Sequence, residues 1–282
     1  MATEELERMP DVGGLTRRAA AGLLVRGRPG TLTDTELLVR GVTVDRERMA
    51  AYARVCGFAV SDTPPPTYPH VLAFPLSMEL MTRPGFPFPL VGLVHIANVI
   101  EVVRAVDASQ RLDLSVRTEN LRDHTRGRTI DLVATATVDG EVVWRGRSRY
   151  LRPEKSAASP LREPGPPPAT PSAVWRVGAD VGRAYAAVSG DRNPIHTSTV
   201  AARLFGFPRR IAHGMWSKAR CLAALEGRLP AALTVDVSFK LPILLPSTVA
   251  FASSPSEESD GWSITLHSAA SARTHLTGTI TG

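Results

Sequence analysis

The chain has 282 residues, 43% of them hydrophobic and 21% charged, which is typical of a globular protein with a buried core. Its net charge is +6, but 30 of the 33 basic residues are Arg, scattered without interleaved aromatic residues, so we expect no nucleic-acid partner. No apolar run reaches the roughly 20 residues that span a bilayer. The first ten residues lack the apolar stretch of a secretion signal, so we expect a cytoplasmic protein.

The two cysteines, Cys56 and Cys221, are far apart and outside any C-x-x-C spacing. Neither a disulfide framework nor a zinc cluster is indicated, and we expect no metal. Residues 153–173 are rich in Pro, Ser and Ala and carry no hydrophobic period, which predicts a linker. We therefore expect an N-terminal extension (1–30), a first unit (31–152), this linker and a second unit (174–282).

The two predicted units repeat the same order of elements. In the first unit, a short helix closes at Gly57, a long helix covers residues 90–105, and strands follow at 111–121, 129–138 and 141–151. In the second unit, a short helix closes at Gly190 and a long helix covers residues 211–226. Strands follow at 233–241, 248–253, 261–268 and 274–281. Each unit is then an α+β arrangement in which an antiparallel sheet curls around its long helix.

The most informative motif follows Gly190. It reads Ser189-Gly190-Asp191-Arg192-Asn193-Pro194-Ile195-His196, and Gly206-Phe207 and Ala212-His213-Gly214-Met215 come after it. This pattern resembles the MaoC-like, hydratase 2 group of (R)-specific enoyl-thioester hydratases. The first unit resembles the non-catalytic half of actinobacterial two-repeat dehydratases, through Pro66-Thr67-Tyr68-Pro69-His70 and Gly92-Leu93-Val94-His95. The resemblance implies a double hot-dog fold and an active site in the second unit.

The chemistry of such a reaction suits Asp191 and His196. Adding water to an enoyl thioester requires a proton to leave the water, a proton to reach C2, and stabilisation of the enolate on the thioester oxygen. A carboxylate and an imidazole five residues apart on an irregular loop can hold one water between them. We assign the water proton to Asp191 and protonation of C2 to His196 in hydration, although the sequence fixes the pair and not the direction of each transfer.

Gly214 is the candidate oxyanion donor, because it stands at the start of the second long helix, where free N–H groups and the positive end of the helix dipole meet. His213 beside it is expected to make a structural hydrogen bond or to contact substrate. Asn193 is expected to shape the turn or tether the Asp191 carboxylate. Tyr68, His70 and His95 either pack in the core or line an acyl tunnel.

The substrate is expected to be an acyl-CoA or an acyl-carrier-protein thioester, with no other cofactor. Candidate contacts to its phosphates are Arg209, Arg210, Lys218 and Lys240. A homodimer is a further expectation. Two alternative functions are a non-catalytic acyl-thioester binding module, which would be expected to lack the Asp or the His, and a hot-dog thioesterase. The thioesterase would need a carboxylate on its long helix, and residues 214–225 contain none.

Two alignments of the repeat test whether the first unit carries the same chemistry. Matching Gly85 with Gly206 places His70 opposite Asp191, and matching Gly57 with Gly190 places Phe58 there. Neither gives the first unit an Asp and His pair. The distance from Gly57 to Gly85 also exceeds that from Gly190 to Gly206, so about 12 extra residues are expected in the first unit. We therefore expect the first unit to be non-catalytic and to widen the acyl cleft.

Overall fold

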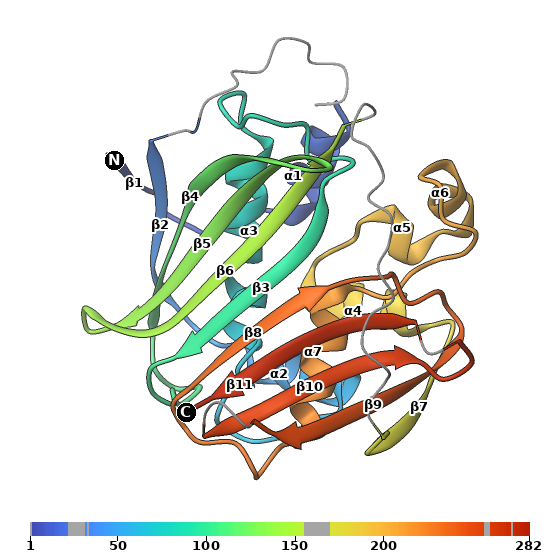
Figure 1. Cartoon of the computed structure of the whole chain (residues 1–282). Helices are drawn as coiled ribbons and strands as arrows, with labels where there is room; N and C mark the ends of the chain where they lie inside the picture. The colour runs from blue at the N-terminus through green and yellow to red at the C-terminus, as the bar shows by residue number, and fades with distance from the viewer. Residues whose placement is uncertain (1, 22–31, 33, 155–169, 257–259, 272) are drawn as a thin grey trace.

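The fold consists of two units that share one sheet. The computed structural model describes residues 2–21, 32, 34–154, 170–256, 260–271 and 273–282. Within these residues, one sheet of 11 strands runs in the order β1-β2-β4-β5-β6-β3-β8-β11-β10-β9-β7. Figure 1 shows helix α3 against one half of this curved sheet and α7 against the other. The α+β class and the double arrangement expected from the sequence are confirmed.

The first unit contains β1 (Ala2–Glu5), α1 (Val12–Ala21), β2 (Thr35–Val42), α2 (Arg46–Cys56), α3 (Tyr68–Thr82), β3 (Val94–Val102), β4 (Leu112–His124), β5 (Gly127–Val138) and β6 (Glu141–Pro153). The second contains β7 (Ala173–Val177), α4 (Val181–Ser189), α5 (Pro194–Thr197), α6 (Thr199–Leu204), α7 (Gly214–Ala223), β8 (Leu233–Phe239), β9 (Ser247–Pro255), β10 (Gly261–Ser268) and β11 (Thr274–Thr281). Of the expected N-terminal extension, β1 pairs with β2. Residues 22–31 of the extension and 155–169 of the linker lie outside the described residues, so these boundaries stay predictions.

Apart from β1 at the edge next to β2, the strand order is symmetric about the pairing of β3 with β8. On one side follow β6, β5, β4 and β2, and on the other β11, β10, β9 and β7, each in the matching position. The central pair is antiparallel, with Asn98 opposite Val237 and Ile100 opposite Val235. The two units are therefore related by a pseudo-twofold axis, which matches β3 with β8, α2 with α4 and α3 with α7.

Both short helices end as the sequence predicts. Gly57 closes α2 with φ 84°, and Gly190 closes α4 with φ 83°. A glycine adopts this left-handed conformation without the steric cost that a side chain would add. The end of α4 matters for function, because the motif loop begins at this turn.

The prediction of a long helix at residues 90–105 is wrong. Residues 94–102 form β3, which pairs with β6 on one side and β8 on the other. The helix of the first unit lies earlier, at Tyr68–Thr82, where Pro69 in the first turn and Pro75 inside the helix concealed it. Nearly every face of α3 is buried, so it lacks the amphipathic period by which a helix is recognised.

This correction also changes the alignment of the two units. Because α3 matches α7, the residue before α3, Thr67, corresponds to His213 before α7. The connection from Gly57 to Thr67 is short, whereas that from Gly190 to His213 is longer and contains α5 and α6. The extra residues expected in the first unit are thus in the second, and they carry the Asp and His motif.

The core is continuous across both units. Its largest fully buried side chains include Tyr52, Tyr68, Phe86 and Tyr185, and both cysteines are buried and free. Of the helices in the described part of the chain, none has the length and apolar character needed to cross a membrane.

Candidate active site

The loop that follows α4 is held by short-range hydrogen bonds. The N–H of Asp191 donates to Ser189 Oγ at 3.2 Å, and the N–H of Asn193 donates to Asp191 Oδ1 at 3.2 Å. The side-chain oxygen of Asn193 accepts the N–H of Ile195 at 3.4 Å and caps α5, with Pro194 in its first turn. The Asn193 backbone therefore tethers the carboxylate while its side chain starts the helix, which makes its contribution positional.

His196 lies in α5 and is 8% exposed. Its Nδ1 lies 2.8 Å from the carbonyl oxygen of Ile211. Because a carbonyl oxygen only accepts, Nδ1 carries the hydrogen in the neutral ring and Nε2 keeps its lone pair. Helix α4 packs closely on this turn, since a Cβ added at Gly182 would lie 2.2 Å from the carbonyl oxygen of His196. The tight contact holds His196 at a fixed distance from α4.

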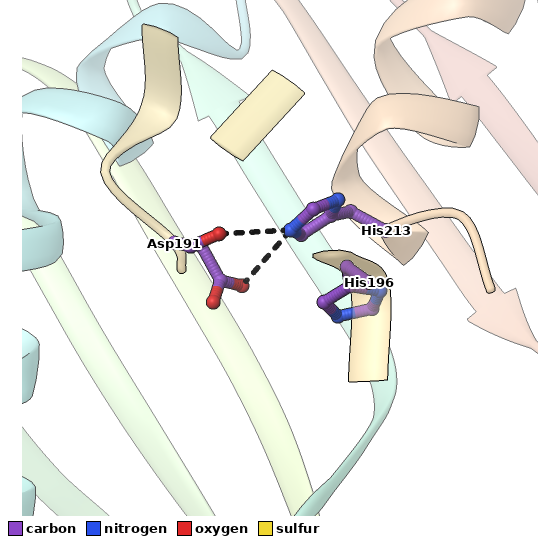
Figure 2. Close-up of side chains that lie close together, drawn as sticks. All are labelled: Asp191, His196 and His213. Carbon is purple, nitrogen blue, oxygen red and sulfur yellow. Dashed lines mark hydrogen bonds and ion pairs between the residues drawn. The ribbon is translucent and has the colours of Figure 1, made fainter. Parts of the chain in front are cut away.

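His213 joins Asp191 to the start of α7. Its Nε2 donates to the backbone oxygen of Asp191 at 3.0 Å and lies 3.9 Å from the carboxylate oxygen Oδ2 (Figure 2). The His213 ring stacks on His196 with centroids 3.6 Å apart and contacts the Tyr185 ring at 4.8 Å. The structural hydrogen bond expected of His213 is therefore present, and it fixes the Asp191 loop against α7.

Burial sets the charges of this cluster. Burial acts to raise the pKa of Asp191, but His213, His196 and the N–H of Asn193 together leave it below its ordinary value. Burial lowers the pKa of His196, and it lowers the pKa of His213 to about 3. At neutral pH the cluster therefore holds one ionised carboxylate and two neutral imidazoles.

The cluster opens into a cavity of about 650 Å³, within the range of small-molecule sites. The second unit contributes Asp191, His196 and Gly214 to its wall. The first unit contributes polar side chains (His70, His95, Tyr150) and apolar ones (Val71, Phe74, Met78, Met81, Leu90). The site thus lies between the units, with an apolar wall suited to an acyl chain.

The donor set also meets the distance requirement of a metal site, since Asp191, His196 and His213 offer ligand atoms within 4.8 Å of one another. The hydrogen bonds count against this use. The His213 Nε2 hydrogen is committed to the backbone oxygen of Asp191, and the His196 Nδ1 hydrogen is committed to that of Ile211. The arrangement suits proton transfer better than metal binding.

Only some of the residues expected to contact substrate line the cavity. Lys240 and His213 line the cavity, whereas Arg209, Arg210 and Tyr68 are not among its lining residues. Tyr68 is fully buried against Tyr52. The prediction that Lys218 contacts a phosphate is wrong, because this side chain is fully buried. Its Nζ donates to two oxygens of Asn98 and to Val235 O at 2.6–3.0 Å. It ties α7 to the central strands.

Three cavity residues were missed by sequence reasoning. The Tyr185 ring lies against His213, and the rings of Tyr150 and Phe239 both lie against His95. The repeat contained a signal for Tyr185, since Tyr52 occupies the same place before Gly57 and the two rings lie 5.9 Å apart. Tyr150 lies in β6 and Phe239 ends β8, and only the paired sheet brings these strands of different units together.

We expect the first unit to supply no acid or base. Burial lowers the pKa of His70 to about 4 and that of His95 to about 3, so both rings are neutral, and they stack with centroids 6.3 Å apart. His70→Gln and His95→Gln should each keep turnover of crotonyl-CoA within about tenfold, because loss of a true acid or base costs about 100-fold or more. Steady-state kinetics would measure this. A loss as large as that of Asp191→Asn would contradict the assignment.

Comparison with known proteins gives a consistent result. A MaoC like domain matches residues 162–271. The 3-hydroxyacyl-thioester dehydratase X of Mycobacterium tuberculosis is 40% identical over 95% of this chain and 96% of its own. The enoyl-CoA hydratase ChsH3 of the same organism is 28% identical over 74% of this chain and 76% of its own.

Solved structures agree with this comparison. The crystal structure of M. tuberculosis HtdX superposes with a TM-score of 0.78 at 39% identity, over 88% of this chain and 99% of that one. A conserved M. tuberculosis protein described as a double hot-dog fold superposes at 0.51 with 12% identity, over 85% of this chain and 92% of that one, and supports the fold alone. Fold and site together define a double hot-dog protein with an Asp and His cluster at the wall of a cavity between its two units. This chain belongs to the MaoC-like family of thioester dehydratases and hydratases.

Proposed function

We propose that this protein is a hydro-lyase that reversibly hydrates trans-2-enoyl thioesters to (R)-3-hydroxyacyl thioesters. The observation that carries the proposal is an ionised carboxylate beside a neutral imidazole, within 4.8 Å of each other, at the wall of a large and mostly apolar cavity. The relatives named for this reaction support it. Both members of the pair are present, which disfavours a non-catalytic binding module. Helix α7 carries no carboxylate, which disfavours a thioesterase.

The hydrogen bond of His196 supports one division of the proton transfers. Because Nδ1 donates to Ile211, Nε2 is free to take a proton from water while the water oxygen adds to C3. The imidazolium formed then returns that proton to C2. Asp191 accepts a hydrogen bond from the second O–H of the water, which stays on the oxygen as the product hydroxyl, and stabilises the imidazolium. His196 keeps the role at C2 that the sequence indicated and also takes the water proton that we had assigned to Asp191.

The enolate oxygen is proposed to meet the N–H of Gly214. Gly214 is the first residue of α7, and the first-turn N–H groups of a helix have no intrahelical acceptor. Gly214 lines the same cavity as Asp191. Each step balances with these groups and one water, so we propose that the reaction needs no metal or redox cofactor.

For the carrier of the acyl group we propose coenzyme A or acyl carrier protein. Lys240 is exposed and lines the cavity, and Arg126 lines it from the first unit, so both can meet phosphate oxygens. Arg209 and Arg210 stay candidates for phosphates outside the cavity. A cytoplasmic location and a homodimer stay predictions from the sequence.

The direct test is hydration of crotonyl-CoA and longer trans-2-enoyl-CoA thioesters, followed by the loss of the conjugated thioester absorbance. Chiral analysis of the product should give the (R)-3-hydroxyacyl thioester alone. Absence of turnover with every chain length, or formation of the (S) product, would overturn the proposal. Release of free coenzyme A without hydration would instead indicate a thioesterase.

The division of proton transfers predicts the pH dependence. The active form needs His196 neutral and Asp191 ionised, and burial keeps the pKa of His196 below its usual 6.5. Raising the pH through neutrality removes no required proton, whereas acid protonates His196 and Asp191. The value of kcat/KM for crotonyl-CoA should therefore be level at neutral and alkaline pH and fall only below pH 6.5. A fall as the pH rises through 6 to 7 would show that imidazolium is the active form.

A further inference from the structure

The structure has a second cavity, of about 290 Å³. It lies at the position that the pseudo-twofold axis relates to the catalytic cavity. The catalytic cavity is lined by the loop after α4, the start of α7, the end of β8 and the α3–β3 connection. The second cavity is lined by the loop after α2, the start of α3, the end of β3 and the α7–β8 connection. The two linings share no residue. These four elements of one lining are the symmetry mates of the four of the other, so the second cavity is the counterpart of the active site in the first unit.

The chemistry of the second cavity differs from that of the active site. Among the described residues that line it there is no His, Asp or Cys, so it has no acid and base pair. Its wall includes the apolar side chains of Phe58, Leu72, Trp144 and Leu233. The indole N–H of Trp144 donates to Pro66 O at 2.8 Å, so that polar group is satisfied within the protein. The cavity therefore presents a mostly apolar surface.

Two charged residues lie on the lining of the second cavity. Glu226 accepts the N–H of Ala59 at 2.8 Å and is thereby engaged in holding the loop after α2. The guanidinium of Arg104 donates to Ala105 O at 3.2 Å, and within the described residues no ion pair joins it to a carboxylate. Arg104 is thus a half-buried cation that an anionic group can reach beside an apolar wall.

We propose that the second cavity is a non-catalytic site for an alkyl carboxylate of medium length, with the chain along Trp144 and the carboxylate at Arg104. Its volume lies just below the roughly 300–1,000 Å³ typical of ligand sites, which favours a medium-length chain over a long one. Because this cavity is the symmetry counterpart of the catalytic cavity, it can hold an acyl chain although it lacks the catalytic groups. Pro69 and Leu72 of α3 line this cavity, while His70 and Phe74 of the same helix line the active site.

The test is titration calorimetry of sodium octanoate into the full-length protein and two Trp variants. Ala231→Trp places an indole on the exposed α7–β8 connection that lines the second cavity. Ala187→Trp places the same group on the exposed face of α4, outside both linings, and serves as the matched control. Wild type and Ala187→Trp should bind octanoate alike. Ala231→Trp should bind it at least tenfold more weakly and turn over crotonyl-CoA within twofold of wild type.

Two further measurements test whether Arg104 binds the carboxylate and whether octanoate binds outside the active site. Arg104→Gln should weaken octanoate binding severalfold and leave 1-octanol binding unchanged, and bound octanoate should not raise the KM for crotonyl-CoA. If Ala231→Trp misfolds by circular dichroism, Ala105→Trp tests the same wall from the β3–β4 connection. Undetectable binding to wild type at millimolar octanoate, or unchanged binding in the folded Trp variant, would overturn the proposal. Turnover of crotonyl-CoA reports on the proposed function independently.

Discussion

Asp191→Asn and His196→Ala are each expected to lower kcat for crotonyl-CoA hydration by about 100-fold or more, which is the usual cost of losing a positioned acid or base. In Asp191→Asn the amide cannot stabilise the imidazolium that forms on His196, although the N–H of Asn193 keeps an acceptor oxygen. In His196→Ala the group that takes the water proton is absent. Because both changes interrupt one relay, the double variant should be little slower than either single one.

The control for these changes is Asp139→Asn. Asp139 is exposed in the β5–β6 turn and has φ 52°, a conformation that Asn also tolerates. Its turnover should match that of wild type. Circular dichroism and thermal unfolding should show that all variants are folded. Near-normal kcat in a folded Asp191→Asn or His196→Ala variant would show that the catalytic pair is assigned wrongly.

Gly214→Val is expected to lower kcat/KM for crotonyl-CoA by roughly 100-fold, since loss of one oxyanion donor costs on the order of 3 kcal/mol. A Cβ added at Gly214 would lie 3.2 Å from the ring of Phe239, which itself lines the cavity. The valine therefore displaces that ring or fills the approach to the helix N-terminus. Either result keeps the thioester oxygen from the Gly214 N–H.

Two further variants make the Gly214 result interpretable. Gly214→Ala adds only the Cβ and should give a smaller loss, while Ala187→Val adds a β-branched side chain on α4 away from the cavity and should give none. Melting temperatures separate misfolding from blocked binding. If a folded Gly214→Val variant kept wild-type kcat/KM, Gly214 could not be the oxyanion position, and the Asn193 side chain would be the next candidate.

Local sequence determined much of this protein. The left-handed turns at Gly57 and Gly190 need a residue without a side chain, so glycine marked both helix ends. Several strands could also be predicted, because side chains alternate between the two faces of a strand and an apolar residue at every second position marks the buried face. The spacing of Asp191 and His196 is equally local, since a short loop and one helical turn connect them.

Tertiary structure decided the features that depend on distant partners. Residues 94–102 form a strand because β6 and β8 pair with both of its edges, and α3 is a helix despite Pro75 because the sheet buries it on nearly every side. Lys218 is a surface cation by residue type, yet oxygens of Asn98 and Val235 surround its ammonium group. A hydrogen bond to Ile211, set by how α5 meets the following segment, fixed the tautomer of His196 and hence its proposed chemistry.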